Sequence, residues 1–300
     1  MTEQRIKSVD ALRGMALLAI LLANLPFEAS VAQQGEVDKI LEMMFHLLID
    51  KKFITIFSIL FGFGFYYQMK KAESGSVNFK KYFIIRMILL FLIGTLHGYI
   101  LWYGDIIKAY ALGAIVLLFL YKMPVNRILY TAVIFNVLLT GIVYIGNNAL
   151  GWQEYSYDYS LADKLPIVTT YAEYFRINFT INPWTNFPQD MPLTLVFTFG
   201  NMLIGFVMAK SNFFISPNKR FQNLLIISGL TIGLAASYIF YLILNGTLEL
   251  SMNLIWLPFL LIFISPQLII SPFFFSPGIT PQMQFRRTNK WFGLPVFFRN

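Results

Sequence analysis

The sequence predicts an all-α protein, a polytopic bundle of about eight transmembrane helices with its N-terminus in the cytoplasm. Three observations predict this fold. The composition is too apolar for a water-facing surface, a series of long apolar segments runs along the chain, and the short segments between them alternate between basic and acidic. A lipid bilayer is therefore the expected partner of most of the surface.

The composition separates this chain from soluble proteins. Of its 300 residues, 57% are hydrophobic and 13% are charged, whereas a soluble domain carries about 25% charged residues. The formal net charge of +8 does not indicate a nucleic acid partner, because the basic residues are spread over several short segments. The absence of cysteine excludes disulfides and thiolate sites. With two histidines in the whole chain, no metal site is expected.

The apolar segments are predicted to be membrane-spanning helices. At about 1.5 Å per residue, each reaches or approaches the roughly 30 Å needed to cross the hydrocarbon. Helices are expected because the hydrocarbon has no water to satisfy backbone polar groups. The segments run over residues 11–27, 53–69, 83–103, 106–121, 128–145, 192–209, 224–244 and 252–275.

The orientation of the bundle follows from Lys and Arg in the short loops. Basic residues lie before the first segment and in every second loop after it, while the alternate loops are acidic. The basic loops and both chain ends are therefore expected on the cytoplasmic side. As an alternative for the first segment, Arg5, Lys7 and the sequence SVA at 30–32 match a cleavable secretory signal.

One domain is expected over residues 1–275, followed by an irregular basic tail over 276–300. The longest outer loop, about residues 146–191, is rich in tyrosine. It is interpreted either as a functional lid or as an aromatic belt resting on the membrane surface. Within it, Asn178 begins the glycosylation sequence NFT.

His97 and Asp105 are the candidate catalytic residues. The sequence YGD at 103–105 predicts a tight outer turn, with Gly104 as its hinge and Asp105 at or near the N-cap of the next helix. His97 then lies about 9 Å inside the outer end of its helix. An ionisable residue inside a membrane indicates function, and a histidine beside a carboxylate is a general-base arrangement.

Other interpretations of this stretch stay open. Asp105 is also explained as a simple helix cap, and His97 as a neutral histidine bonded within the bundle. Lys108 is a rival partner for Asp105, with its ammonium group reaching the membrane surface. Trp102 and Tyr103 are expected to lie above His97 as supporting residues.

A second candidate cluster lies at the cytoplasmic end. Asp10 and Arg13 are spaced to pair on the first turn of the first helix, and Arg86 lies at a similar depth after Lys80 and Lys81. These cations are explained either by anchoring at the inner face or by binding a phosphorylated ligand. The glycines at 62 and 64 are interpreted as sites of close helix packing rather than a phosphate loop.

Four stretches carry a family resemblance. They are RIKSVDALRGMALLAILLANL, FITIFSILFGFGFYYQ, RMILLFLIGTLHGYILWYGDIIKAYALG and GNMLIGFVMAKSNFF, within residues 5–214. They resemble the YeiB-like family of bacterial inner-membrane proteins, a domain of unknown function. That family in turn resembles the transmembrane acyltransferases, which include the heparan-glucosaminide acetyltransferase and the bacterial glycan O-acyltransferases.

The resemblance implies a function in the inner membrane. It implies a donor, acetyl-CoA or another acyl-CoA, bound from the cytoplasm, and a glycan or lipid acceptor on the outer side. His97, with Asp105, would act as general base or transient acyl carrier, and Arg13, Arg86, Lys80 and Lys81 would hold the donor phosphates. No bound cofactor is expected, and the sequence leaves the oligomeric state open.

The chain departs from the family after Phe275. Family members continue with further spans and a segment similar to GRMALTNYL, which is absent here. The tail is therefore expected to reflect a truncation or frameshift. Two other classes of function remain open: a transporter or permease with His97 and Asp105 as an ion or proton site, and a membrane protein without chemistry.

Overall fold

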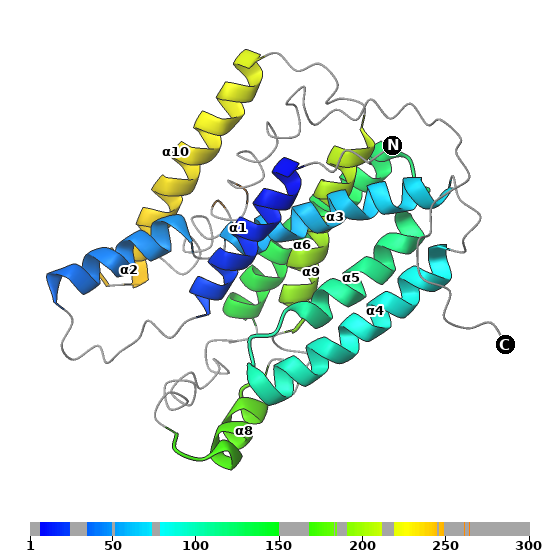
Figure 1. Ribbon diagram of the computed structural model, residues 1–300. Helices are drawn as coiled ribbons and strands as arrows, with labels where there is room; N and C mark the ends of the chain where they lie inside the picture. The colour runs from blue at the N-terminus through cyan, green and yellow to red at the C-terminus, as the bar shows by residue number, and fades with distance from the viewer. Residues whose placement is uncertain are drawn as a thin grey trace.

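The computed structural model describes residues 7–24, 35–49, 52–73, 79–149, 168–182, 184, 191–211, 219–244, 246–248, 261 and 264. Over these residues the chain is helical and contains no strand, which confirms the all-α prediction. Figure 1 shows the arrangement. The helices are α1 (Lys7–Ala23), α2 (Glu36–Leu48), α3 (Lys52–Glu73), α4 (Phe79–Leu96), the π-helix η2 (His97–Leu101), α5 (Ile107–Leu120), α6 (Val125–Ala149), α8 (Tyr171–Thr180), α9 (Met191–Lys210) and α10 (Lys219–Leu244).

Seven of the predicted apolar segments coincide with helices, namely α1, α3, α4 with η2, α5, α6, α9 and α10. The eighth, at 252–275, lies outside the described residues except for Leu261 and Ile264, and so does the tail at 276–300. Two helices were not predicted. These helices, α2 and α8, are too short and too polar to be recognised as membrane-spanning segments.

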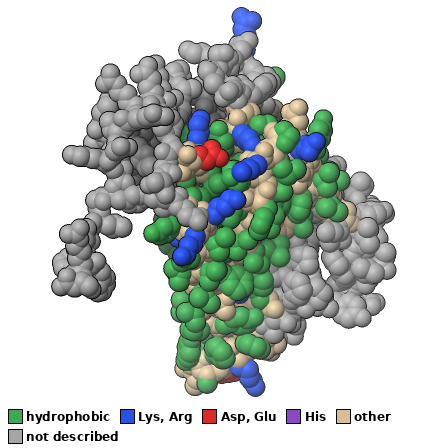
Figure 2. Space-filling model, turned by 90° about the vertical axis from the view of Figure 1, so that its right-hand side faces the viewer, with side chains coloured by type: hydrophobic (Ala, Val, Ile, Leu, Met, Phe, Trp, Pro, Cys, Tyr) green, Lys and Arg blue, Asp and Glu red, His purple; other side chains and the backbone are tan. Residues whose placement is uncertain are grey.

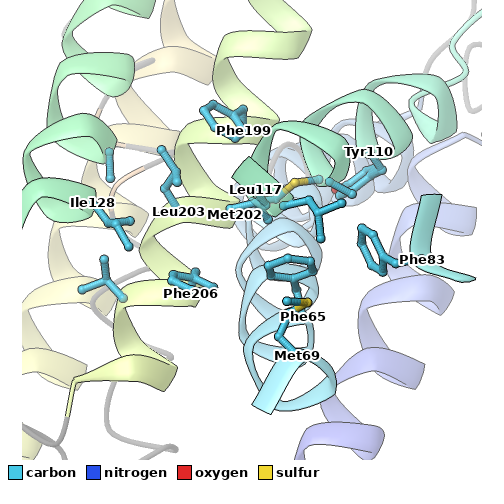
Figure 3. Close-up of a cluster of buried hydrophobic side chains, with 14 of the residues drawn as sticks. Phe65, Met69, Phe83, Tyr110, Leu117, Ile128, Phe199, Met202, Leu203 and Phe206 are labelled. Carbon is cyan, nitrogen blue, oxygen red and sulfur yellow. The ribbon is translucent and has the colours of Figure 1, made fainter. Parts of the chain in front are cut away.

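A core of aromatic and aliphatic side chains joins α3, α4, α5, α6 and α9. Figure 3 shows Phe65 on α3 between Phe83 on α4 and Phe206 on α9. Met202 and Leu203 of α9 are fully buried in the same cluster. The hydroxyl of Tyr110 on α5 is satisfied inside the core by Ser58, at 2.8 Å. Five helices are therefore held by one continuous apolar cluster.

Glycines bring α3 and α9 into backbone contact. A Cβ on Gly62 would collide with the carbonyl of Met202, and a Cβ on Gly205 would collide with the carbonyl of Ile59. The two glycines thus form a reciprocal crossing in which each helix backbone fills the space that a side chain would need. The interpretation of Gly62 as a packing residue is confirmed. Gly64 instead makes room for the guanidinium of Arg13.

Two of the described helices are long and apolar enough to cross a membrane, residues 79–101 and 226–243. Only 17% and 22% of their apolar windows are buried within the chain. Three further apolar helices are shorter and cover residues 107–120, 125–138 and 195–210. Large hydrophobic side chains such as Ile93, Leu96 and Phe119 are more than half exposed. The described helices therefore present much of their apolar surface outward.

Candidate functional site

The site begins where α4 changes into a π-turn. The backbone N–H of Trp102 donates to the carbonyl of His97 at 2.9 Å, which closes a wider turn than in an α-helix. The chain then leaves the helix, because Trp102 is extended, with φ −157° and ψ 117°. Short π-turns inside helices often occur at functional sites. The sequence predicted an ordinary helix through Tyr103, so the π-turn is a correction to that prediction.

His97 and Asp105 lie in contact across the turn between η2 and α5. Nδ1 of His97 is 3.1 Å from Oδ1 of Asp105. The carboxylate side chain is fully buried, while the imidazole is 37% exposed. An ionised carboxylate only accepts hydrogen bonds, so Nδ1 carries the proton and donates it. This tautomer leaves the lone pair of Nε2 able to accept a proton.

Asp105 lies directly before Ile106, the N-cap residue of α5, and its side chain bonds to the first turn of that helix, near the predicted place. Its Oδ1 accepts from the N–H of Ile107 at 3.2 Å and its Oδ2 from the N–H of Lys108 at 3.3 Å. The positive end of the helix favours an ionised carboxylate at this place. The cap and the histidine partner are therefore two functions of one side chain, rather than competing explanations.

Lys108 does not reach the surface. Its residue is 1% exposed, and its Nζ lies 4.0 Å from Oδ2 of Asp105. Nζ also lies over the rings of Tyr99 and Trp184, at 4.7 and 4.9 Å from their centroids. The expectation that this lysine extends to the membrane surface is wrong, because aromatic rings from η2 and from the segment after α8 enclose it.

The helix α8 covers the end of the π-turn. The last four carbonyls of a helix have no partner within it. Here, side chains from α8 and from the segment just after it donate to every one of them. The bonds run from Asn178 to Gly98 (3.0 Å) and Tyr99 (2.8 Å), from Asn182 to Gly98 (2.8 Å), from Tyr171 to Ile100 (2.9 Å), and from Tyr174 to Leu101.

These contacts show two properties of the segment that contains α8. Asn178 is fully buried and its Nδ2, the atom that glycosylation modifies, is engaged with two carbonyls, so the match to a glycosylation sequence has no accessible acceptor. Tyr174 remains a donor because burial, and then the nearby Tyr171, raise the pKa of its phenol. This segment thus clamps the helix end that carries His97. Residues 150–167 lie outside the described chain.

Replacing Asn178 by Ala is expected to destabilise the protein by about 2 kcal/mol, because the carbonyl of Tyr99 loses its donor and that of Gly98 loses one of two. Thermal unfolding of the purified protein in detergent measures this loss. The matched control is Thr231→Val, which removes an exposed hydroxyl that bonds only to its own helix. Equal melting temperatures for the two variants would contradict the clamping role of α8.

The two supporting aromatic residues lie on the turn itself. The indole N–H of Trp102 donates to Asn24 at the end of α1, at 3.1 Å, and its ring lies 4.7 Å from that of Tyr103. A Cβ on Gly104 would come within 2.7 Å of the indole nitrogen. Among the glycines described, only Gly246 has a positive φ. Gly104 is therefore required for close approach to Trp102 rather than as a hinge.

The two predicted arginines lie along α3, away from the turn that carries His97 and Asp105. Arg13 donates to the carbonyl of Leu60 on α3 at 3.1 Å and lies 3.6 Å from Asp10. Arg86 on α4 bonds to Gln68 on α3 at 3.3 Å. The structure therefore brings both arginines against α3, through different residues.

The predicted lysines and one further lysine lie where α4 begins and where α5 and α9 end. Lys80 and Lys81 are exposed at the start of α4, and Nζ of Lys80 lies 6.0 Å from the centre of the Tyr121 ring. Lys210, which the sequence analysis did not single out, donates to the carbonyls of Tyr121 and Met123 at 2.7 and 2.6 Å. Its position at the end of an apolar segment was the sequence feature that could have identified this lysine. Figure 2 shows Lys and Arg side chains gathered over one end of a mainly hydrophobic face.

The two candidate sites are far apart along α4. Lys81 lies at the start of this helix and His97 directly after its end, a separation of roughly 24 Å at about 1.5 Å per residue. Lys108 and Tyr121 lie at the corresponding ends of the neighbouring helix α5. The hairpin of α4 and α5 thus connects a basic end to a histidine–carboxylate end.

The amino-acid sequence is similar to those of proteins that are described as uncharacterized. No family model matches the chain, and no solved structure matches it. YxaH from Bacillus subtilis (strain 168), an uncharacterized protein, is 29% identical over 274 residues, which cover 80% of this chain and 67% of YxaH. YeiB from Escherichia coli (strain K12), also uncharacterized, is 33% identical over 119 residues, which cover 36% of this chain and 29% of YeiB.

The chain is similar to YeiB-like proteins. An uncharacterized 39.9 kDa protein from Bacillus acidopullulyticus adds a third relative, 31% identical over 134 residues, or 44% of this chain and 38% of that protein. The matches thus span well under half of the lengths of YeiB and the 39.9 kDa protein. The relatives support the YeiB-like resemblance, and their names carry no activity.

Proposed function

We propose that this chain is a multi-pass protein of a bacterial inner membrane that transfers an acyl group from cytoplasmic acyl-CoA to an acceptor on the outer face. The observation that carries the proposal is the contact of His97 with the buried carboxylate of Asp105 at one end of the α4–α5 hairpin, with cations at the other end. One end suits a phosphorylated donor, and the other suits proton transfer.

The surface supports the membrane part of the proposal. Leu92, Ile93 and Leu96 on α4 and Ile227 on α10 are more than half exposed. A contiguous apolar surface of this kind rarely faces water in a soluble monomer, and lipid chains would cover it. The contacts of Lys80 and Lys210 around Tyr121 place the start of α4 beside the ends of α5 and α9. This is the arrangement that alternating spans with basic inner loops require.

The basic end supports a nucleotide donor. Phosphates are bound well by arginine forks and lysine ammonium groups. The first turns of α4 carry Lys80, Lys81 and Arg86. Arg86 bonds to Gln68 on α3, and the ammonium of Lys80 lies over the ring of Tyr121 at the end of α5. Arg13 lies against the middle of α3, at Leu60 and Gly64. A donor held by these cations would extend its flexible pantetheine arm along α4 and α5 toward His97.

The proposed reaction uses the tautomer set by Asp105. Nε2 of His97 accepts the proton of the acceptor hydroxyl or amine while the oxygen or nitrogen attacks the thioester carbonyl. The carbon–sulfur bond breaks, and the imidazolium returns its proton to the leaving thiolate. The products are an acylated acceptor and free CoA. Asp105 stabilises the imidazolium that forms between the two steps.

A double-label experiment in inverted membrane vesicles tests this function. Acetyl-CoA carrying carbon-14 in the acetyl group and tritium in the adenine is supplied outside, at the cytoplasmic face. The proposal predicts that carbon-14 enters the lumen or the membrane as acylated product while tritium stays outside. Entry of both labels together would indicate a transporter. If the vesicles take up no more carbon-14 or tritium than vesicles that lack the protein, the proposed function is contradicted.

A further inference from the structure

Lys108 has a buried ammonium group with no hydrogen-bond partner among the described residues. Its side chain is 2% exposed, and Asp105, the nearest carboxylate, lies 4.0 Å away, beyond hydrogen-bond distance. Burying a cation in this way is unfavourable unless its donors are used. All three N–H groups are therefore available to a ligand.

The surroundings stabilise the charge of Lys108 without using its donors. The rings of Tyr99 and Trp184 lie 4.7 and 4.9 Å from Nζ, within the range of a cation–π interaction. Such an interaction acts through the ring faces and does not require a hydrogen bond. A Cβ on Gly98 would lie 2.7 Å from Nζ. Gly98 thus leaves the ammonium in place beside the π-turn.

Two other buried polar atoms near this point have no partner among the described residues, namely Oδ1 of Asn178 and Nε1 of Trp184. Asn178 bonds to the carbonyl of Gly98 through its Nδ2, and the Trp184 ring faces Nζ of Lys108. The three unused polar atoms thus belong to side chains from α5, from α8 and from the segment after it, of which Lys108 and Asn178 contact Gly98 and Trp184 contacts Lys108. This concentration indicates a polar ligand rather than a packing defect.

The charges around Asp105 indicate what kind of ligand fits. The carboxylate of Asp105 faces the ammonium of Lys108 and the imidazole of His97. When His97 accepts a proton, two cations share the same carboxylate and the site gains a net positive charge. An anion that forms at the same moment would neutralise it. The oxyanion of a tetrahedral intermediate forms at this moment and needs a donor placed in advance.

We propose that Lys108 donates a hydrogen bond to the carbonyl oxygen of the transferred acyl group. This inference rests on the acyl transfer proposed above. As the acceptor oxygen bonds to the carbonyl carbon, the π electrons of the C=O bond move onto the oxygen, and the acceptor proton moves to Nε2 of His97. The ammonium holds the oxyanion until the C=O bond re-forms, the carbon–sulfur bond breaks and the thiolate takes the proton from His97.

Infrared difference spectroscopy tests this contact directly. Protein in lipid nanodiscs is given acetyl-CoA with carbon-13 or carbon-12 at the carbonyl, and the difference isolates the bound carbonyl band. A hydrogen bond from Lys108 is expected to move this band to lower frequency than in water. The Lys108→Met variant keeps the length of the side chain and removes the donor. Lys39→Met, on the exposed surface of α2, is the matched control.

The outcomes separate the two proposals. Loss of the frequency shift in Lys108→Met, with the shift intact in Lys39→Met, supports the contact. A bound carbonyl band with the same shift in the wild type and in Lys108→Met overturns the role of Lys108 and leaves the acyltransferase proposal standing. A wild-type protein with no bound carbonyl band overturns the acyltransferase proposal, and this inference with it.

Turnover gives a second readout. Removing one donor to an oxyanion typically lowers kcat about 100- to 1,000-fold, and we expect this loss in Lys108→Met with little change in the KM for the donor. Gly98→Ala keeps the lysine but pushes against its ammonium, so a smaller loss of kcat is expected. A rise in KM alone in Lys108→Met would assign the residue to ground-state binding and contradict the proposal.

Discussion

Replacing Asp105 by Asn is expected to lower acyl transfer about 1,000-fold or more. An amide keeps only part of the cap of α5, because its single oxygen accepts the N–H of Ile107 or that of Lys108 but not both. It no longer stabilises the imidazolium of His97, and it does not enforce the tautomer that leaves Nε2 free. Initial rates of carbon-14 acetyl transfer in vesicles measure the effect. An asparagine variant within threefold of the wild-type rate would remove Asp105 from the mechanism.

The same substitution is also expected to destabilise the protein by about 3 kcal/mol, because it leaves the buried ammonium of Lys108 without its nearest carboxylate. The double variant Asp105→Asn with Lys108→Met removes both charges and should recover much of this loss. Thermal unfolding in detergent compares the single and double variants. If the double variant is no more stable than Asp105→Asn alone, the two charges are not coupled.

Replacing Gly62 by Val is expected to prevent assembly of the bundle. The new side chain would occupy the position of the Met202 carbonyl, so α3 and α9 must separate along their crossing. Overpacking a rigid core commonly costs about 1–3 kcal/mol, and here the opposing atoms are backbone that has no alternative rotamer. The yield of monodisperse protein after size-exclusion chromatography measures assembly.

The matched control for this prediction is Gly141→Val on α6, where a Cβ would meet nothing within 4 Å. Gly205→Val should behave like Gly62→Val, because it meets the carbonyl of Ile59 at the same crossing. The pair is coupled, so the double variant should be little worse than either single variant. Normal yields for Gly62→Val would contradict the crossing of α3 and α9.

The sequence predicted the long helices because their signal is local. Runs of apolar residues and basic flanks mark α3, α4 and α9 without any knowledge of their neighbours. Gly62 was interpreted correctly for the same reason, since a small residue inside an apolar helix favours close packing. The YGD turn indicated that Asp105 and His97 lie on either side of one chain reversal, and the structure shows that their side chains touch.

The parts that the sequence did not predict depend on distant contacts. The π-turn after Leu96 leaves backbone carbonyls without a partner in its own helix. Asn178 and Asn182, about eighty residues away along the chain, donate hydrogen bonds to the carbonyl of Gly98. The burial of Lys108 requires Trp184, which lies in a loop with no periodic pattern. An isolated lysine near a helix end reads as a surface residue, and only the tertiary structure shows what covers it.

The central claim is that His97 transfers an acyl group, and one measurement tests it most directly. Single-turnover transfer of carbon-14 from double-labelled acetyl-CoA is followed in inverted vesicles containing the wild type, His97→Gln or His97→Ala. The imidazole bonds only to Asp105 among the described residues, so both variants should assemble normally. The account predicts carbon-14 transfer without tritium in the wild type and transfer at the level of empty vesicles in both variants. Equal transfer in all three proteins would contradict it.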